Sequence, residues 1–392
     1  MAEPHKDPSA GSASLPAQLA GFTFTRTVFN TGYRMIYPFL PVIARGLGVD
    51  LPTVALALTA RSSLGLASPL LGSQADRRGR KRTMLSSLLL FTASMGALAL
   101  FPRLPVLFLA LMGGTLAKLT FDPAMQAYLG DRVPYERRGL AIALTEFGWS
   151  LAFLVGVPLA GLAILRSGWS GPFSWLAILG AVSAIVLWRI LPGDGPPTAG
   201  SLSLAAGLRM VARHRSAMAG LAVGFCISLA NEMVNVVFGA WLEQAFQLQV
   251  LALGAASAVI GVAELTGEGL VAGLADKLGK RRAVAIGIGT NILAALALPV
   301  LGISIPGALL GLFLFYITFE ITLVSAIPLM TELVPEARAT VMAGNVGSHS
   351  AGRSLGALIA LPLFAGGLWG NTLAAVGFNL LALFLLLRFV RE

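Results

Sequence analysis

Long apolar segments separated by short charged turns dominate this sequence. Apolar residues make up 56% of the 392 residues and charged residues only 12%, whereas a soluble domain is about a quarter charged. A soluble fold could not bury so much apolar surface, so lipid must surround most of the chain. The segments long enough to cross a bilayer as helices, at ~20 residues each, are 17–44, 51–75, 83–101, 105–130, 139–165, 171–190, 217–243, 250–275, 283–303, 305–331, 339–366 and 369–388.

A basic turn that follows the second apolar segment returns in the second half of the chain. The sequence DRRGRKR at 76–82 is echoed by DKLGKRR at 276–282, and DRVP at 131–134 is echoed by ELVP at 332–335. Each pair falls at the same place in its half, so the chain contains a duplicated unit of six predicted helices. Such repeats are typical of secondary transporters. They predict an all-α integral membrane protein with twelve transmembrane helices in two pseudo-symmetric six-helix bundles.

The repeat divides the chain into four parts. Residues 1–16 are polar and rich in Pro, Ser and Ala, without the apolar core of a signal peptide, and we expect a disordered cytoplasmic tail. Residues 17–191 and 217–392 are the predicted N-terminal and C-terminal bundles. Residues 192–216 contain several Pro and Gly and three arginines, which indicates a cytoplasmic linker.

The distribution of basic turns predicts the orientation in the membrane. The turns that share a face with residues 76–82 hold nineteen lysines and arginines, whereas the opposite turns hold three, Arg45, Arg103 and Arg166. Positive residues favour the cytoplasmic side, so both termini are predicted to be cytoplasmic, in a cytoplasmic or inner cell membrane. The net charge of +10 is spread over these turns, and this pattern argues against a nucleic-acid partner.

Ionisable residues inside the predicted spans mark a shared polar cavity. A charge is costly in hydrocarbon, so each should face protein or water. The segments 83–101, 171–190, 283–303 and 369–388 carry none well inside the span, and we expect them to face lipid. The eleven buried charges are Arg26, Arg34, Arg61, Lys118, Asp122, Glu146, Glu232, Glu264, Glu268, Glu320 and Arg353.

Several of these residues form polar stripes at helical spacing. Arg34 could clamp an anionic substrate group with its paired donors, or it could form an internal ion pair with Glu146, Asp122 or another acid. Trp149 could line a pocket for an amphiphile or pack at the lipid interface. The candidate substrate and cavity residues are Asn30, Tyr33, Arg34, Tyr37, Arg61, Asn231, Asn235 and Arg353.

The buried carboxyl groups are candidates for proton coupling, because burial favours the protonated form. Glu232 is the first candidate, since Asn231 and Asn235 flank it. Glu146 is the second, and Asp122 is as suited to a structural ion pair. The full set of proton-coupling candidates is Glu232, Glu146, Asp122, Glu264, Glu268 and Glu320.

The turn after the second segment resembles the signature of the major facilitator superfamily. That signature is a Gly, an Asp four residues on, then Arg, any residue, Gly, Arg and a basic residue. The resemblance implies a conformational latch, in which Asp76 faces a helix terminus of the second half, Arg77 pairs with Asp131, and both contacts hold the cytoplasmic face shut. Topogenic charge is the alternative interpretation. The implied latch residues are Gly72, Asp76, Arg77, Gly79, Arg80 and Asp131, and Lys81 completes the signature.

The direction of transport is predicted from a further resemblance. Gly148, Gly156, Pro158 and Gly161 resemble the glycine-rich fifth helix of exporters in the family, whereas the exporters' fourth-helix Arg signature is missing and Leu111 lies near its place. The resemblance implies a proton-coupled antiporter that exports a small amphiphilic compound by alternating access. Uptake or exchange of an organic anion, or lipid flipping, is the alternative.

The sequence lacks the motifs of other classes. Its three histidines, His5, His214 and His349, are too scattered for a metal site in the membrane. The single cysteine, Cys226, allows no disulfide framework. No phosphate-binding loop follows a predicted strand. We therefore expect neither an enzyme nor a cofactor, and we expect a monomer whose partners are a small-molecule substrate, protons and membrane lipid.

Overall fold

The computed structural model describes residues 14–68, 79–194 and 204–391. Within these ranges the regular elements are all helices. Nine of the described helices are both long and apolar enough to cross a membrane. The predicted tail lies outside the described residues up to residue 13, and the predicted linker does so from 195 to 203.

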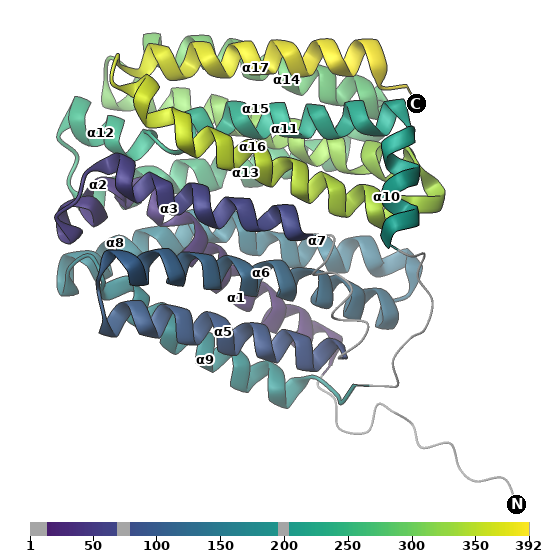
Figure 1. The fold of residues 1–392 in the computed structure, drawn as a ribbon, viewed down its shortest axis with the longest axis horizontal. Helices are drawn as coiled ribbons and strands as arrows, with labels where there is room; N and C mark the ends of the chain where they lie inside the picture. The colour runs from purple at the N-terminus through teal and green to yellow at the C-terminus, as the bar shows by residue number, and fades with distance from the viewer. Residues whose placement is uncertain (1–13, 69–78, 195–203, 392) are drawn as a thin grey trace, which may run out of the picture.

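The first half of the chain forms one bundle, shown in purple and blue in the lower part of Figure 1. The second half forms the other, shown in green and yellow above it. The elements of the first bundle are α1 (Leu15–Arg34), α2 (Ile36–Leu47), α3 (Leu51–Ser63), η1 (Leu64–Ala67), α5 (Arg80–Leu100), α6 (Leu104–Arg132), α7 (Tyr135–Leu151), η2 (Ala152–Gly156), α8 (Val157–Ser167) and α9 (Gly171–Ile190).

The second bundle follows α10 (Leu204–Arg213), a short helix within the predicted linker that crosses the end of the molecule near the C-terminus (Figure 1). Its bounds match the predicted spans closely, apart from one interruption at Val236 and Val237. The elements are α11 (Arg215–Asn235), α12 (Phe238–Phe246), α13 (Val250–Leu278), α14 (Lys280–Leu301), α15 (Ile305–Glu332), η3 (Pro335–Ala337), α16 (Arg338–Phe364) and α17 (Leu368–Phe389).

Prolines explain two interruptions that a span prediction does not show. The predicted helix 17–44 breaks at Met35, between α1 and α2. Pro38 lies three residues later and has no N–H to donate to the carbonyl of Arg34. In the predicted helix 139–165, the π-helical turn η2 ends two residues before Pro158, which cannot donate to Leu154. Both breaks place irregular backbone next to charged side chains.

The four helices without charged residues in their middle lie on the outside of the molecule. In Figure 1, α5 and α9 form the lower edge, and α14 and α17 form the upper edge. Their outward side chains are large and apolar, as lipid requires. Examples are Leu89, Ile178, Trp188, Leu293, Val300, Leu373 and Phe384, each 53–66% exposed.

The two bundles are in contact at the end opposite the C-terminus, which we call the distal face. There α2 lies against α12 (Figure 1). A Cβ at Gly239 would lie 2.5 Å from the carbonyl oxygen of Pro38 and 2.7 Å from that of Tyr37. Arg45 and Glu243 form an ion pair across the same junction. These contacts close the distal face, and we call the opposite end the terminal face.

Candidate functional site

A buried ion pair joins the two bundles near their centre. The guanidinium of Arg34 on α1 donates two hydrogen bonds to Glu264 on α13, at 2.7 Å from Nη1 to Oε2 and 2.5 Å from Nη2 to Oε1. The two side chains are only 4% and 2% exposed. This paired geometry uses the planar fork of arginine, which lysine lacks. Arg34 is therefore held by a carboxylate of the other half.

Two aromatic rings hold the same guanidinium in place. Its central carbon lies 4.1 Å from the ring centre of Trp149 and 3.7 Å from that of Phe153. Its Nη1 also donates to the carbonyl oxygen of Trp149 at 3.0 Å. The sequence indicates a pocket or interface role for Trp149 and no particular role for Phe153. Trp149, Ser150 and Phe153 follow Glu146 by three, four and seven residues. This helical spacing is the sequence signal that could have placed them on one face with Glu146.

Acidic groups outnumber cations at this position. Ser150 on α7 donates to Oε1 of Glu268 at 3.0 Å, one turn along α13 from Glu264. Between them lies Gly267, where a Cβ would approach Glu320 of α15 to 2.9 Å. Glu320 is 3% exposed, and its Oε2 is buried without a hydrogen-bond partner. Three carboxyl groups thus adjoin one guanidinium.

Glu232 lies in a second hydrogen-bond network, and the positive charges of Arg353 and Arg61 also act on it. The hydroxyl of Tyr37 on α2 donates to its Oε1 at 2.9 Å, and Nδ2 of Asn235 donates to its Oε2 at 3.2 Å. Tyr316 on α15 in turn donates to Oδ1 of Asn235 at 2.8 Å. Glu232 is fully buried. The network links α2, α11 and α15 across the bundle interface.

A third group of charges lies closer to the terminal face, within the first bundle. Arg26 pairs with Glu146 at 2.6 Å and with Asp122 at 3.4 Å. Lys118 pairs with the same Asp122 at 2.5 Å. The side chain of Glu146 is 40% exposed. Arg34, which follows Arg26 by eight residues on α1, is only 4% exposed. Access to the charged centre therefore increases toward the terminal face.

Two further arginines from the predicted cavity have no carboxylate partner among the described ion pairs. Arg61 on α3 is fully buried and donates from Nη1 to the carbonyl oxygen of Tyr33 at 2.6 Å. Its guanidinium stacks on the Tyr33 ring at 3.8 Å. Arg353 on α16 lies 5.8 Å from the ring centre of Trp149. Asn30 and Asn231 are also buried, with amide nitrogens that lack a partner.

The predicted latch can be described only in part. Gly72, Asp76 and Arg77 lie outside the described residues. Asp131 pairs with Arg80 at 3.4 Å. Lys280 and Glu332 repeat this pair in the second half, as the sequence duplication requires.

The glycine that ends each basic turn has a structural reason. Gly79 has φ +92° and Gly279 has φ +80°, a region that other residues rarely adopt. Each glycine immediately precedes the first residue of the next helix. Both halves thus start their third span with the same backbone conformation.

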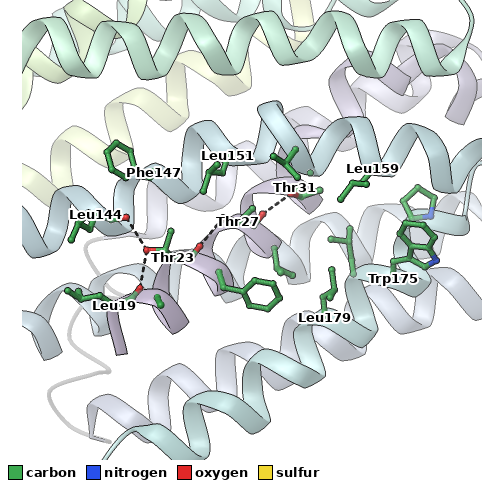
Figure 2. Close-up of a pocket in the computed structure, with 18 of the residues that line it drawn as sticks. Leu19, Thr23, Thr27, Thr31, Leu144, Phe147, Leu151, Leu159, Trp175 and Leu179 are labelled. Carbon is green, nitrogen blue, oxygen red and sulfur yellow. Dashed lines mark hydrogen bonds between the residues drawn. The ribbon is translucent and has the colours of Figure 1, made fainter. Parts of the chain in front are cut away.

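A large apolar cavity lies away from the charged centre. Its volume is about 770 Å³, and its lining comes from α1, α7, η2, α8 and α9. Figure 2 shows Thr23, Thr27 and Thr31 in a row along α1, with dashed lines to carbonyl oxygens. No ionisable residue lines this cavity. It therefore resembles a surface for lipid rather than a site that could bind a proton.

The chain belongs to the Major Facilitator Superfamily. The family's sequence model matches residues 22–357 and, a second time, 220–392. This membership and the twelve-helix, two-bundle architecture confirm the predicted family and fold class. The family is one of membrane-embedded transporters. Among the described residues, no group of three or more His, Cys, Asp or Glu side chains could hold a metal ion.

Relatives with names include efflux proteins. The multi-drug resistance efflux pump PmrA of Streptococcus pneumoniae is 25% identical over 262 residues, which is 64% of this chain and 65% of PmrA. A probable sugar efflux transporter of Helicobacter pylori is 28% identical over 186 residues, 46% of this chain and 47% of that protein. The chain thus matches less than two thirds of the length of each.

Solved structures share the fold at low sequence identity. The human organic anion transporter MFSD10 (TETRAN) superposes with a TM-score of 0.73 at 21% identity, over 96% of this chain and all of that one. A bacterial homologue of the lysosomal transporter Spinster, in an inward-facing and unoccupied conformation, gives a TM-score of 0.72 at 15% identity, over 95% of this chain and 97% of that one.

Proposed function

We propose that this transporter exports a small amphiphilic organic compound in exchange for protons, by alternating access of its two bundles. The observation that carries the proposal is the excess of acid at the buried Glu264 and Glu320 and the partly buried Glu268, where Arg34 is the one cation paired among the described ion pairs. An uncompensated buried carboxylate is costly, so this cluster favours the binding of a proton. The names of the efflux relatives support export.

The proposed coupling runs through the ion pair between the bundles. Protonation of Glu264 removes the charge that holds Arg34, and the two bundles then separate more easily. Glu268 lies one turn away and Glu320 packs against the intervening glycine, so both are placed to exchange the proton with Glu264. Glu146 and Arg26, nearer the terminal face, provide the charged groups on the route to solvent.

Proteoliposomes with an imposed pH gradient test the proposal. Three fluorescent amphiphiles serve as probes: the anion anilinonaphthalene sulfonate, the neutral phenylnaphthylamine and the cation ethidium. We expect gradient-driven movement of at least one probe by the wild type, and its loss in Glu264→Gln and Glu320→Gln. Glu336→Gln, at an exposed position, is the control and should transport normally.

The two carboxyl groups favoured by the sequence are tested in the same assay. Loss of gradient-driven transport in Glu232→Gln or Glu146→Gln alone would move the coupling site to that residue. Undiminished transport in all four glutamate variants would contradict proton coupling through these groups. Failure of the wild type to move any probe with the gradient would contradict the export proposal itself.

We also propose that the terminal face is cytoplasmic. The support is the concentration of basic residues in its turns. Single cysteines in a Cys226→Ala background test this orientation: one replaces the exposed Glu336 on the terminal face, and one replaces Ile303, 86% exposed on the distal face. In intact cells an impermeant thiol reagent should label only the cysteine at 303. The opposite pattern would invert the orientation.

Uptake or exchange of an organic anion is the second candidate function. Arg61 and Arg353 favour it, because neither has a carboxylate partner among the described ion pairs. Counterflow separates the two candidates. Exchange of anilinonaphthalene sulfonate across the membrane without a pH gradient, undiminished in Glu320→Gln, would support the anion exchanger over the proton-coupled exporter.

A further inference from the structure

The short helix α10 (Leu204–Arg213) lies at the terminal face and runs across the direction of the spans (Figure 1). It lies where two of the spans begin. A Cβ at Gly207 would clash with Oγ1 of Thr340, near the start of α16, and α11 begins at Arg215, two residues after α10 ends. The hydrocarbon core of a bilayer ends near the ends of the spans, so α10 lies at the level of the lipid headgroups.

One face of α10 is fixed to the second bundle. Gly207 and Val211 lie one helical turn apart, and both are buried. His214, which follows α10, accepts a hydrogen bond at Nδ1 from the backbone N–H of Ala217, 3.3 Å away. This contact caps α11, so the turn between the two helices is held as well. α10 therefore moves together with α11 and α16.

The opposite face of α10 is basic. Arg209 and Arg213 follow the two buried residues by two positions each, which is about 200° around a helix. Both arginines are exposed, and residues 204–213 include no acidic residue. The adjoining η3 carries one acid, the exposed Glu336. None of the described ion pairs includes Arg209, Arg213 or Glu336, so the outer face of α10 presents a positive charge.

Apolar side chains flank the two arginines. Leu208 is 43% exposed and Met210 is 38% exposed, and the helical period places them on either side of the basic face. A helix whose basic residues adjoin exposed apolar ones is typical of helices that lie in the membrane interface. There the apolar side chains enter the edge of the acyl region, and the long arginine side chains reach the phosphates.

This combination of side chains selects the kind of partner. A small anion in solution would pair with the arginines and leave Leu208 and Met210 in water, whereas a phospholipid offers a phosphate and an apolar chain together. Basic residues near a membrane surface attract anionic lipids. We propose that α10 binds the headgroups of anionic phospholipids through Arg209 and Arg213, in the leaflet on the terminal side.

The lipid contact goes beyond the proposed function, because it assigns a lipid partner and does not depend on the substrate or on the coupling ion. Its consequence follows from the way α10 is held. Since α10 is fixed to α11 and α16, a lipid bound by Arg209 and Arg213 also holds the terminal end of the second bundle at the surface of the leaflet. The contact anchors one bundle and not the other.

Quenching of fluorescence by brominated lipids tests the proposal with the whole protein in liposomes. In a Cys226→Ala background, Ala212→Cys places one fluorophore on the exposed part of α10. The liposomes mix anionic phosphatidylglycerol with zwitterionic phosphatidylcholine, and one of the two is brominated near its headgroup. We expect stronger quenching by brominated phosphatidylglycerol. Each basic residue near an anionic surface strengthens binding about 5-fold, so Arg209→Gln and Arg213→Gln should each lower the preference for phosphatidylglycerol about 5-fold.

Matched variants separate the charge of α10 from other effects. The double variant Arg209→Lys/Arg213→Lys keeps both charges and should retain most of the preference. The double variant Arg103→Gln/Arg166→Gln removes two exposed arginines from the distal face, and its fluorophore should be quenched as in the wild type. The preference should also weaken at high salt, because exposed charges are screened.

Three results would overturn the proposal. Equal quenching by the two brominated lipids in the wild type would show that α10 contacts lipid without recognising its charge. Absence of quenching by either lipid would place the outer face of α10 in water, where a soluble partner could bind it. An unchanged preference in Arg209→Gln/Arg213→Gln would show that other residues attract the anionic lipid.

Discussion

Arg34 and Arg45 form ion pairs of the same geometry in two different environments. Each donates two hydrogen bonds to a glutamate of the other bundle, Arg34 to Glu264 at 2.5 and 2.7 Å and Arg45 to Glu243 at 2.7 and 3.0 Å. The central pair is 4% and 2% exposed, whereas the distal pair is 62% and 24% exposed. Contact geometry alone therefore does not distinguish their roles.

The difference in burial separates their energies and their uses. Water and salt screen an exposed pair, which stabilises a protein by only about 0.2–1 kcal/mol. Removing one partner of a buried pair leaves an uncompensated charge and costs about 3–5 kcal/mol. The buried pair is therefore sensitive to the protonation of its carboxylate, as coupling requires. The exposed pair can open and close with little change in energy, as a gate requires.

The largest expected effect comes from breaking the central pair. Arg34→Leu or Glu264→Leu alone should lower the free energy of unfolding by about 3–5 kcal/mol, because each leaves one charge buried without its partner. The double variant Arg34→Leu/Glu264→Leu removes both charges and should recover most of that loss. The free energy of unfolding of all three variants is measured in mixtures of a mild detergent and dodecyl sulfate. A double variant as unstable as the sum of the singles would show that the charges act independently.

The sequence predicted the spans and the side chains that face the interior, because apolar length and helical period are local properties. Lys118 and Asp122, four residues apart, are paired as their spacing allows. The sequence does not determine the partner of Arg34, since helical period gives the face of a helix but not the helix opposite it. Glu264 reaches Arg34 only because α13 packs against η2 and α8, a long-range arrangement that no local pattern encodes.

The same reason explains Trp149. Its sequence context was compatible with lipid interface, packing or a pocket. Only the assembled bundles bring cations from α1, α6 and α16 around it. Arg61 is similar, because its stacking on Tyr33 joins α3 to α1. The break between α11 and α12 at Val236 has no proline to explain it, and nothing in the local sequence accounts for it.

An intermediate effect is expected at the backbone contact beside the distal pair. Gly239→Val would place a side chain against the backbone of Pro38 and Tyr37, within 2.5–2.7 Å of atoms that cannot rotate away. Overpacking of this kind costs about 1–3 kcal/mol, and here it falls on the closed distal face. We expect spin labels at Arg103 and Ile303, one on each bundle, to move apart. The outward-facing population should increase accordingly.

A matched glycine makes this measurement specific. Gly377 lies in α17, and a Cβ there would meet no atom within 4 Å. Gly377→Val should leave the distance between the labels at its wild-type value. If Gly239→Val also leaves that distance unchanged, the protein accommodates the new side chain without separating the bundles. The contact between α2 and α12 then does not control closure of the distal face.

The smallest expected effect is that of the distal pair itself, and its salt dependence sharpens the comparison with the central pair. A double-mutant cycle with Arg45→Gln and Glu243→Gln should give a coupling energy of about 0.2–1 kcal/mol, because both side chains remain partly in water. That coupling should shrink as salt is raised from about 0.01 M to about 1 M, where the screening length falls from about 30 Å to about 3 Å. Salt ions cannot enter between Arg34 and Glu264, so the cycle on the central pair should keep its value over the same range. A distal coupling as large as the central one, or equally insensitive to salt, would show that geometry rather than burial sets the energies of these two pairs.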